Sequence, residues 1–211
     1  MPNVKIDPND IAIRLKGLKK SFGPQNVLCD VNLDIRRGET MVIIGKSGGG
    51  KSVILKHMIG LLQPDGGEVT VDGVTISTPK FFDTHTIRRK MGMLFQMGAL
   101  FDSMTVLENV MFPLDMFSND TLRDRIRRAR FCLDRVNLLE AQDKYPGEIS
   151  GGMQKRVSFA RAIVTNPKTI LYDEPTAGLD PISSTLIEDY IVRLKEETIQ
   201  SVASPEESKS D

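Results

Sequence analysis

A glycine-rich segment, residues 45–52, has residue types and spacing that could bind phosphate. It reads Gly-Lys-Ser-Gly-Gly-Gly-Lys-Ser and fits the pattern G-x-x-x-x-G-K-[ST]. Glycines let a loop turn its amide N–H groups inward around phosphate oxygens, and a helix that begins there adds partial positive charge. Lys51 would neutralise the phosphates, and the Ser52 hydroxyl would ligate Mg²⁺. The pattern favours a phosphate-binding loop over an ordinary glycine-rich turn.

Two adjacent carboxylates, Asp173 and Glu174, follow a short apolar run at residues 169–172. A buried strand ending in these acids would deliver Asp173 to Mg²⁺ and leave Glu174 able to polarise an attacking water. Two acids after a strand are often only a solvated loop. Together with the loop at 45–52, they indicate a site that hydrolyses a nucleoside triphosphate.

Strands and helices must position these residues. The apolar segment 53–62 predicts a buried helix directly after the phosphate loop. Alternating or continuous apolar residues predict strands, and Asp72-Gly73 predicts the turn of a hairpin. The expected strands cover residues 11–16, 27–35, 41–44, 68–76 (the hairpin), 90–95 and 169–172.

The pattern between residues 97 and 149 becomes helical. Asn119, Asp120 and Thr121 are good N-cap residues, and one apolar stripe follows them at Leu122, Ile126, Ala129, Leu133 and Val136. The other faces carry Arg123, Arg125, Arg127, Arg128, Arg130 and Arg135. These arginines fit either an anionic partner, such as lipid head groups, or a solvated face, and the solvated face is favoured.

A second glycine turn, residues 147–153, precedes a helix at residues 154–163. Val157, Ala160 and Ile163 are spaced to face inward along that helix. The turn and the helix resemble the arrangement at residues 45–62, where a glycine loop also opens a helix.

The composition fits one globular domain, or one core with a subdomain. The 211 residues include 28 basic and 28 acidic side chains, so net charge gives no support for nucleic-acid binding. Cys29 and Cys132 lie far apart and predict reduced thiols. No apolar signal core and no run near the length of a membrane span are present, which favours a soluble chain or one held at a membrane through a partner.

Five motifs in order resemble the nucleotide-binding subunits of ATP-binding-cassette (ABC) transporters. They are the phosphate loop at 45–52, the glutamine loop at Gln96, the signature Ser150-Gly151-Gly152-Met153, Walker B at 170–174 and the D-loop at 177–180. The resemblance covers residues 11–194. The signature departs slightly, since the family usually has leucine where Ile149 stands and glutamine where Met153 stands.

The resemblance implies a fold and a domain division. The fold is an α/β P-loop NTPase with a RecA-like core, an antiparallel β-lobe and an inserted α-helical lobe at about 96–158. The ATP-binding domain is expected at residues 4–196, and the polar tail 197–211 is expected to be disordered.

The resemblance also assigns roles to single residues. Phe22 would stack on adenine, although a core phenylalanine on a turn is the alternative. Glu174 would be the catalytic base. The residues implied to bind ATP are Phe22, Gly45, Lys46, Ser47, Gly48, Gly49, Gly50, Lys51, Ser52 and Gln96, and those implied to hold Mg²⁺ are Ser52, Gln96 and Asp173.

The signature residues imply a second copy of the domain. Ser150, Gly151 and Gly152 would bind the γ-phosphate of ATP held by another subunit, through amides and a helix dipole. Asp180 would cross the same interface. The implied partners are therefore a second ATP-binding subunit, arranged head to tail, and transmembrane permease subunits.

One branch of the family is especially similar. Residues 93–101, with Met104-Thr105-Val106 and Pro113-Leu114 after them, resemble the ATPase subunits of Mla-type phospholipid transporters. This resemblance implies lipid cargo, a lipid-transfer partner and a place on the cytosolic face of the inner membrane. ABC ATPases that act on ribosomes or DNA generally carry two cassettes or a long coiled-coil insert, and this sequence has neither.

The sequence departs from the family after the helix expected at 183–195. Family members continue into a core strand that ends in a histidine, and that strand lies between the phosphate-loop and Walker B strands. Residues 199–204 could form a shortened strand, with Pro205 in the histidine's place. A truncated product, a fragment and a naturally short form are all open explanations. The alternative function is a nucleotide-binding module with little or no turnover.

Overall fold

The computed structural model describes residues 10–77, 86–96 and 98–203, with side chains described as far as residue 196. The described residues divide into two compact units at the Met91–Gly92 boundary.

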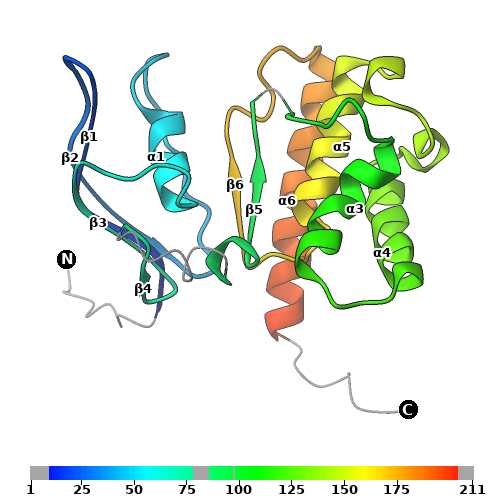
Figure 1. The fold of residues 1–211 in the computed structure, drawn as a ribbon, viewed down its shortest axis with the longest axis horizontal. Coiled ribbons are helices and arrows are strands. Elements are labelled where there is room, and N and C mark those ends of the chain that lie inside the picture. The colour runs from blue at the N-terminus through cyan, green and yellow to red at the C-terminus, as the bar shows by residue number, and fades with distance from the viewer. Residues whose placement is uncertain (1–9, 78–85, 97, 204–211) are drawn as a thin grey trace. The chain divides into compact units, whose positions relative to one another are not determined.

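The first unit is built on a four-stranded antiparallel sheet in the order β2-β1-β3-β4 (Figure 1). Ile13 and Leu15 are buried, whereas Arg14 between them is half-buried and Lys16 is exposed, as a strand with one face toward solvent requires. Asp72 and Gly73 both have positive φ, 49° and 78°, which a two-residue hairpin turn needs. The strands are β1 (Ile11–Phe22), β2 (Gln25–Arg36), β3 (Gly66–Val71) and β4 (Val74–Thr75), which confirms the strands and the hairpin expected here.

The strand expected at residues 41–44 is not formed, so that prediction is wrong. The segment has no regular secondary structure, and Val42 and Ile44 are 71% and 90% exposed. The apolar run identifies residues that could fill a central strand, but a strand also needs neighbours that accept its backbone hydrogen bonds. Among the described residues, neither sheet includes this segment.

The helix after the phosphate loop is α1 (Lys51–Met58), which ends four residues earlier than expected. It begins directly after Gly50, whose φ of 88° is in the left-handed region. Ile54, His57 and Met58 are its buried residues. The described part of the chain holds no helix long and apolar enough to cross a membrane.

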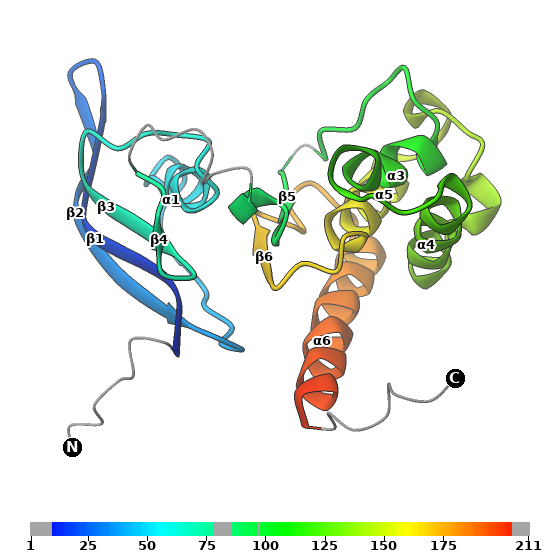
Figure 2. The ribbon, with the colours of Figure 1, turned by 60° about the horizontal axis from the view of Figure 1, so that its bottom comes forward.

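The second unit pairs two short strands with four helices (Figures 1 and 2). Strands β5 (Met91–Leu94) and β6 (Thr169–Tyr172) run side by side in the same direction (Figure 1). The helices are α3 (Val106–Phe117), α4 (Leu122–Arg135), α5 (Gly151–Ile163) and α6 (Pro181–Ala203), with 3₁₀ turns at Leu139–Ala141 and Pro146–Glu148. This confirms the helical segment, the Walker B strand and the helix after the signature.

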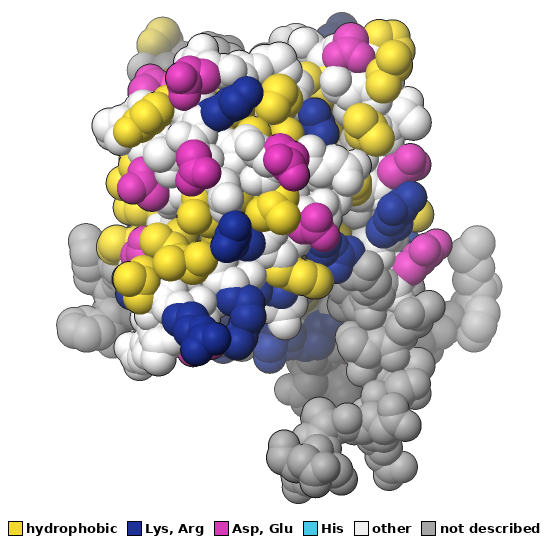
Figure 3. Space-filling view, turned by 90° about the vertical axis from the view of Figure 1, so that its right-hand side faces the viewer, with side chains coloured by type: hydrophobic (Ala, Val, Ile, Leu, Met, Phe, Trp, Pro, Cys, Tyr) yellow, Lys and Arg dark blue, Asp and Glu magenta, His cyan; other side chains and the backbone are white. Residues whose placement is uncertain are grey.

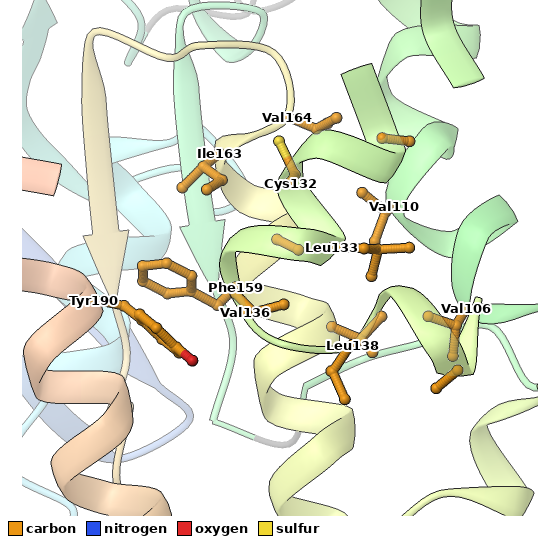
Figure 4. Close-up of a cluster of buried hydrophobic side chains, with 14 of the residues drawn as sticks. Val106, Val110, Cys132, Leu133, Val136, Leu138, Phe159, Ile163, Val164 and Tyr190 are labelled. Atoms are coloured by element: carbon orange, nitrogen blue, oxygen red, sulfur yellow. The ribbon is translucent and has the colours of Figure 1, made fainter. Parts of the chain in front are cut away.

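One hydrophobic cluster holds the second unit together (Figure 4). Helices α3, α4 and α5 pack against one another, and side chains such as Val110, Leu133 and Phe159 meet between them. Tyr190 of α6 lies against Phe159, with ring centroids 5.8 Å apart. Of the stripe expected on α4, Ala129, Leu133 and Val136 are fully buried, whereas Leu122 at the helix start is 56% exposed.

The arginines of α4 are largely used within the unit. Arg125 pairs with Asp115 at 2.6 Å, and Arg127 pairs with Asp124 at 2.7 Å. Nε of Arg128 donates to the Val164 carbonyl at 2.9 Å. Figure 3 shows basic, acidic and hydrophobic side chains interspersed on the side of this lobe. Arg127, whose side chain is 77% exposed, fits the solvated face that was expected, whereas Arg125 and Arg128 are partly buried.

Helix α6 continues to Ala203, so the strand considered for 199–204 is wrong for residues 199–203. Glutamate, lysine and glutamine, which are strong helix formers, are common between Lys195 and Gln200. The expected disordered tail, 197–211, thus begins within a helix. Residues 204–211, including Pro205, lie outside the described residues. Cys29 and Cys132 are both free thiols, as expected.

Asp65 links the segment before β3 to β1. Its carboxylate accepts from Lys20 Nζ at 2.8 Å and from the Ser21 N–H at 2.7 Å, and these bonds lower the Asp65 pKa. Because the pKa is lowered in the folded state, the stabilisation is present above the ordinary value and is lost as pH falls through the lowered one.

We expect Asp65→Asn to lower the urea midpoint near neutral pH, and we expect this effect to shrink as the pH falls through the lowered pKa of Asp65. Glu68→Gln, on the exposed part of β3, is the matched control and should change the midpoint little at either pH. An Asp65→Asn effect that is equally large in acid would contradict the pKa argument.

Candidate nucleotide site

The phosphate loop of the first unit closes around the Lys51 ammonium. Lys51 Nζ donates to the carbonyls of Gly45 at 3.0 Å and Lys46 at 3.1 Å, and the Gly49 N–H donates to the Lys46 carbonyl at 3.1 Å. Gly50 has a φ of 88°, which residues with a side chain rarely adopt, and a Cβ there would lie 2.9 Å from Leu28 Cδ2, so this position favours glycine.

This loop is well suited to bind an anion. Lys51 places a positive charge within the loop, and the first turn of α1 contains no acidic residue. The amides at the start of α1 add the positive end of the helix dipole. Ser52 follows Lys51 in the same first turn, where a hydroxyl could ligate a cation bound to the phosphates.

Phe22 ends β1 in the same unit and is 47% exposed. Lys20 Nζ lies 5.6 Å from the centroid of its ring. This exposure excludes the alternative of a core phenylalanine. Stacking of the ring on adenine stays a prediction.

The second unit brings Gln96 and Glu174 together. Gln96 Nε2 donates to Glu174 Oε2 at 2.8 Å. The contact arises because Gln96 follows β5 and Glu174 follows β6, and the Asp173 N–H donates to the Leu94 carbonyl at 3.0 Å. Asp173 is buried, and Glu174 has a φ of 47°, which is rare for a residue with a side chain.

The donor types fit Mg²⁺. The hydroxyl of Ser52, the carboxylate of Asp173 and the side-chain carbonyl of Gln96 are oxygen ligands, which Mg²⁺ prefers together with water and phosphate. Because Nε2 of Gln96 donates a hydrogen bond to Glu174, the side-chain oxygen Oε1 of Gln96 is the atom that could ligate a cation. Ser52 belongs to the first unit and the other two residues to the second.

The signature residues form the start of α5. Ser150 caps the helix, because its Oγ accepts from the Met153 N–H at 3.2 Å. Ser150 and Gly151 are exposed, and no acidic residue lies in the first turn. A Cβ on Gly152 would lie 2.8 Å from Ser183 Oγ, so this glycine permits close packing against the start of α6. Binding of another subunit's ATP at this helix end stays a prediction.

Asp180 lies directly before α6. Its Oδ1 accepts from the Ser183 N–H at 3.0 Å, and hydrogen bonds from Ser183 lower the Asp180 pKa. An ionised carboxylate at a helix start is favourable. Within this chain Asp180 therefore caps α6, and its predicted place at a subunit interface is not tested by this contact.

Three residues of α5 that contact the segments following Gln96 and Glu174 were not predicted from the sequence. Lys155 donates to carbonyls that follow Glu174, while Ser158 and Arg161 donate to carbonyls that follow Gln96. These partners are backbone atoms of distant segments. No residue spacing in the sequence could have indicated them.

The chain is similar to proteins of known family. The family described as "ABC transporter" matches residues 28–177. The probable ribonucleotide transport ATP-binding protein mkl of Mycobacterium leprae is 44% identical over 188 residues, which cover 88% of this chain and 53% of the relative. Protein TRIGALACTOSYLDIACYLGLYCEROL 3, chloroplastic, of Arabidopsis thaliana is 43% identical over 190 residues, covering 87% and 55%.

Solved structures agree with the expected fold. A dimeric ATP-binding cassette in a post-hydrolysis state, bound to ADP and Pi, has a TM-score of 0.82 and 36% sequence identity. That alignment covers 88% of this chain and 84% of the other. The chain spans about half the length of the two curated relatives named above. The order of the five motifs, the family match and the shared fold together show that this chain belongs to the ABC transporter family, as an ATP-binding cassette.

Proposed function

We propose that this chain binds MgATP and hydrolyses it to drive lipid transport across or between membranes. The observation that carries the proposal is the hydrogen bond between Gln96 and Glu174 at 2.8 Å. It pairs a carboxylate able to accept a proton from water with an amide able to orient that water. Such a pair serves hydrolysis, whereas a site that only stores nucleotide has no need of it.

The residues divide the work between binding and chemistry. Lys51 and the loop amides hold the phosphates, and Glu174 accepts the proton of the attacking water. Mg²⁺, when bound through Ser52, Gln96 and Asp173, would neutralise charge that develops on the phosphates. The start of α5, at Ser150–Gly152, where Ser150 and Gly151 are exposed, would complete the site of a second subunit in a head-to-tail dimer.

The lipid cargo in this proposal rests on two resemblances. The segment 93–101 resembles that of phospholipid transporters, and one relative carries the name of a glycolipid. The Mycobacterium leprae relative is named for ribonucleotide transport, so relatives of this chain differ in cargo. On this proposal the chain lies at the cytosolic face of the inner membrane, held by permease subunits and assisted by a lipid-transfer partner.

A nucleotide-binding module with little turnover is the second candidate. The observation that favours it is the unformed strand at residues 41–44, which leaves the phosphate loop without a strand on its N-terminal side. Turnover requires the phosphates to be held in a fixed position relative to the base, whereas binding alone tolerates more movement.

Calorimetric titration of MgATP tests the binding step shared by both candidates. We expect Lys51→Met to weaken MgATP binding about 10- to 100-fold, because it removes a charged hydrogen-bond donor from the phosphates. Lys56→Met, in the last turn of the same helix, is the control and should bind normally. Equal affinities for Lys51→Met and the wild-type chain would exclude this loop as the nucleotide site.

A further inference from the structure

Helix α5 contacts the backbone just after each member of the Gln96–Glu174 pair. On one side, Arg161 donates to the carbonyls of Gly98 at 2.7 Å and Ala99 at 2.8 Å. Ser158 Oγ also donates to the Gly98 carbonyl, at 2.8 Å. These carbonyls lie two and three residues after Gln96. A forked guanidinium bound to two successive carbonyls fixes both position and direction of the chain.

On the other side, Lys155 Nζ donates to the carbonyls of Pro175, at 3.5 Å, and Ala177. These residues lie one and three positions after Glu174. Lys155 is only 9% exposed, and burial lowers its pKa while the Glu174 carboxylate opposes that shift. A lysine is rarely this buried unless its N–H donors are satisfied. The two hydrogen bonds to carbonyls therefore stabilise the Lys155 ammonium in this position.

The segments that α5 holds have unusual backbone conformations. Gly98 and Ala99 have φ values of 74° and 49°, and Glu174 has a φ of 47°. Residues with side chains adopt this region rarely and at a cost, and they persist there when surrounding contacts fix them. On each side, a side chain of α5 supplies such contacts.

We propose that Lys155 and Arg161 are positioning residues. By fixing the backbone after Glu174 and after Gln96, they keep these two side chains at hydrogen-bonding distance from each other. The inference deepens the proposed function and rests on it, since the pair matters for turnover only if the chain hydrolyses ATP. Because α5 begins with the signature residues Ser150–Gly152, the same rigid helix would link the signature of this subunit to the base of its own site.

Lys155→Met tests the inference, because methionine keeps much of the stem but cannot donate. We expect kcat for ATP hydrolysis to fall about 10- to 100-fold with KM unchanged, since the base is displaced and the phosphate loop is not. Lys155→Arg, which keeps the charge and the donors, should restore most of the activity.

Arg156→Met is the matched control, because Arg156 is the next residue of α5 and donates to the Val136 carbonyl at 3.0 Å, away from the pair. Its kcat should stay close to that of the wild-type chain. A fall in kcat equal in Lys155→Met and Arg156→Met would overturn the inference, since both would then report only loss of structure.

The NMR signal of the Gln96 side-chain amide gives a second measurement that needs no turnover. In the wild-type chain this amide donates to Glu174, and we expect its resonance to shift in Lys155→Met and to stay in place in Arg156→Met. An unmoved resonance in Lys155→Met would overturn the inference even if activity fell. If the wild-type chain shows no hydrolysis at all, the proposed function fails, and the amide signal still decides the role of Lys155.

Discussion

Replacement of Glu174 by glutamine is expected to leave MgATP binding intact and to reduce hydrolysis about 10²- to 10⁴-fold, the usual contribution of a general base. The glutamine amide has nearly the same shape as the glutamate carboxylate. Its oxygen can still accept the hydrogen bond from Gln96, which is 2.8 Å long in the wild-type chain. It has almost no basicity, so it cannot take the proton of the attacking water. Calorimetry should therefore show normal MgATP binding in this variant, whereas the phosphate-release assay should show a strongly reduced rate.

Glu188→Gln is the control for that experiment, because Glu188 is an exposed residue of α6. It removes the same charge from the second unit and should change neither binding nor release. If Glu174→Gln hydrolysed ATP at the wild-type rate, Glu174 could not be the base, and another group would have to activate the water.

Truncation of Leu133 to alanine is expected to lower the free energy of unfolding by about 2–5 kcal/mol. Leu133 of α4 is fully buried in the cluster between α3, α4 and α5 (Figure 4), where neighbours can only partly fill the space left behind. The measurement is a urea unfolding curve followed by circular dichroism.

Leu122→Ala on the same helix provides the comparison. Leu122 is 56% exposed, so its truncation should change the free energy by no more than about 0.5 kcal/mol. Similar losses in the two variants would mean that burial in this cluster is not what stabilises the second unit.

The two short apolar runs before the site show what sequence patterns can and cannot predict. Residues 41–44 and 169–172 both fit a buried strand, yet only the second run forms one, as β6. Strand β6 has a neighbour, as the hydrogen bond from the Asp173 N–H to the Leu94 carbonyl shows. An apolar run predicts which residues could be buried, whereas strand formation depends on partners supplied by distant parts of the chain.

Motif residues were predictable for a different reason. The phosphate loop and the Asp173–Glu174 pair depend on local sequence, because the chemistry needs glycines, a lysine or adjacent acids at fixed spacing. Lys155 and Arg161 depend on tertiary contacts to carbonyls about 20 and 60 residues away in sequence, and their residue types are also common on solvated helices. The role proposed for them depends on the packing of α5 against the segments after β5 and β6, which no local sequence pattern encodes.

Phosphate release by the wild-type chain supplied with MgATP is the decisive measurement of whether the chain hydrolyses ATP. We expect release that continues over many turnovers, requires Mg²⁺ and disappears in Glu174→Gln while that variant still binds MgATP. Tight binding of MgATP with no phosphate released by the wild-type chain would contradict the proposed hydrolysis. The chain would then be a nucleotide-binding module, in which the Gln96–Glu174 pair does not support hydrolysis.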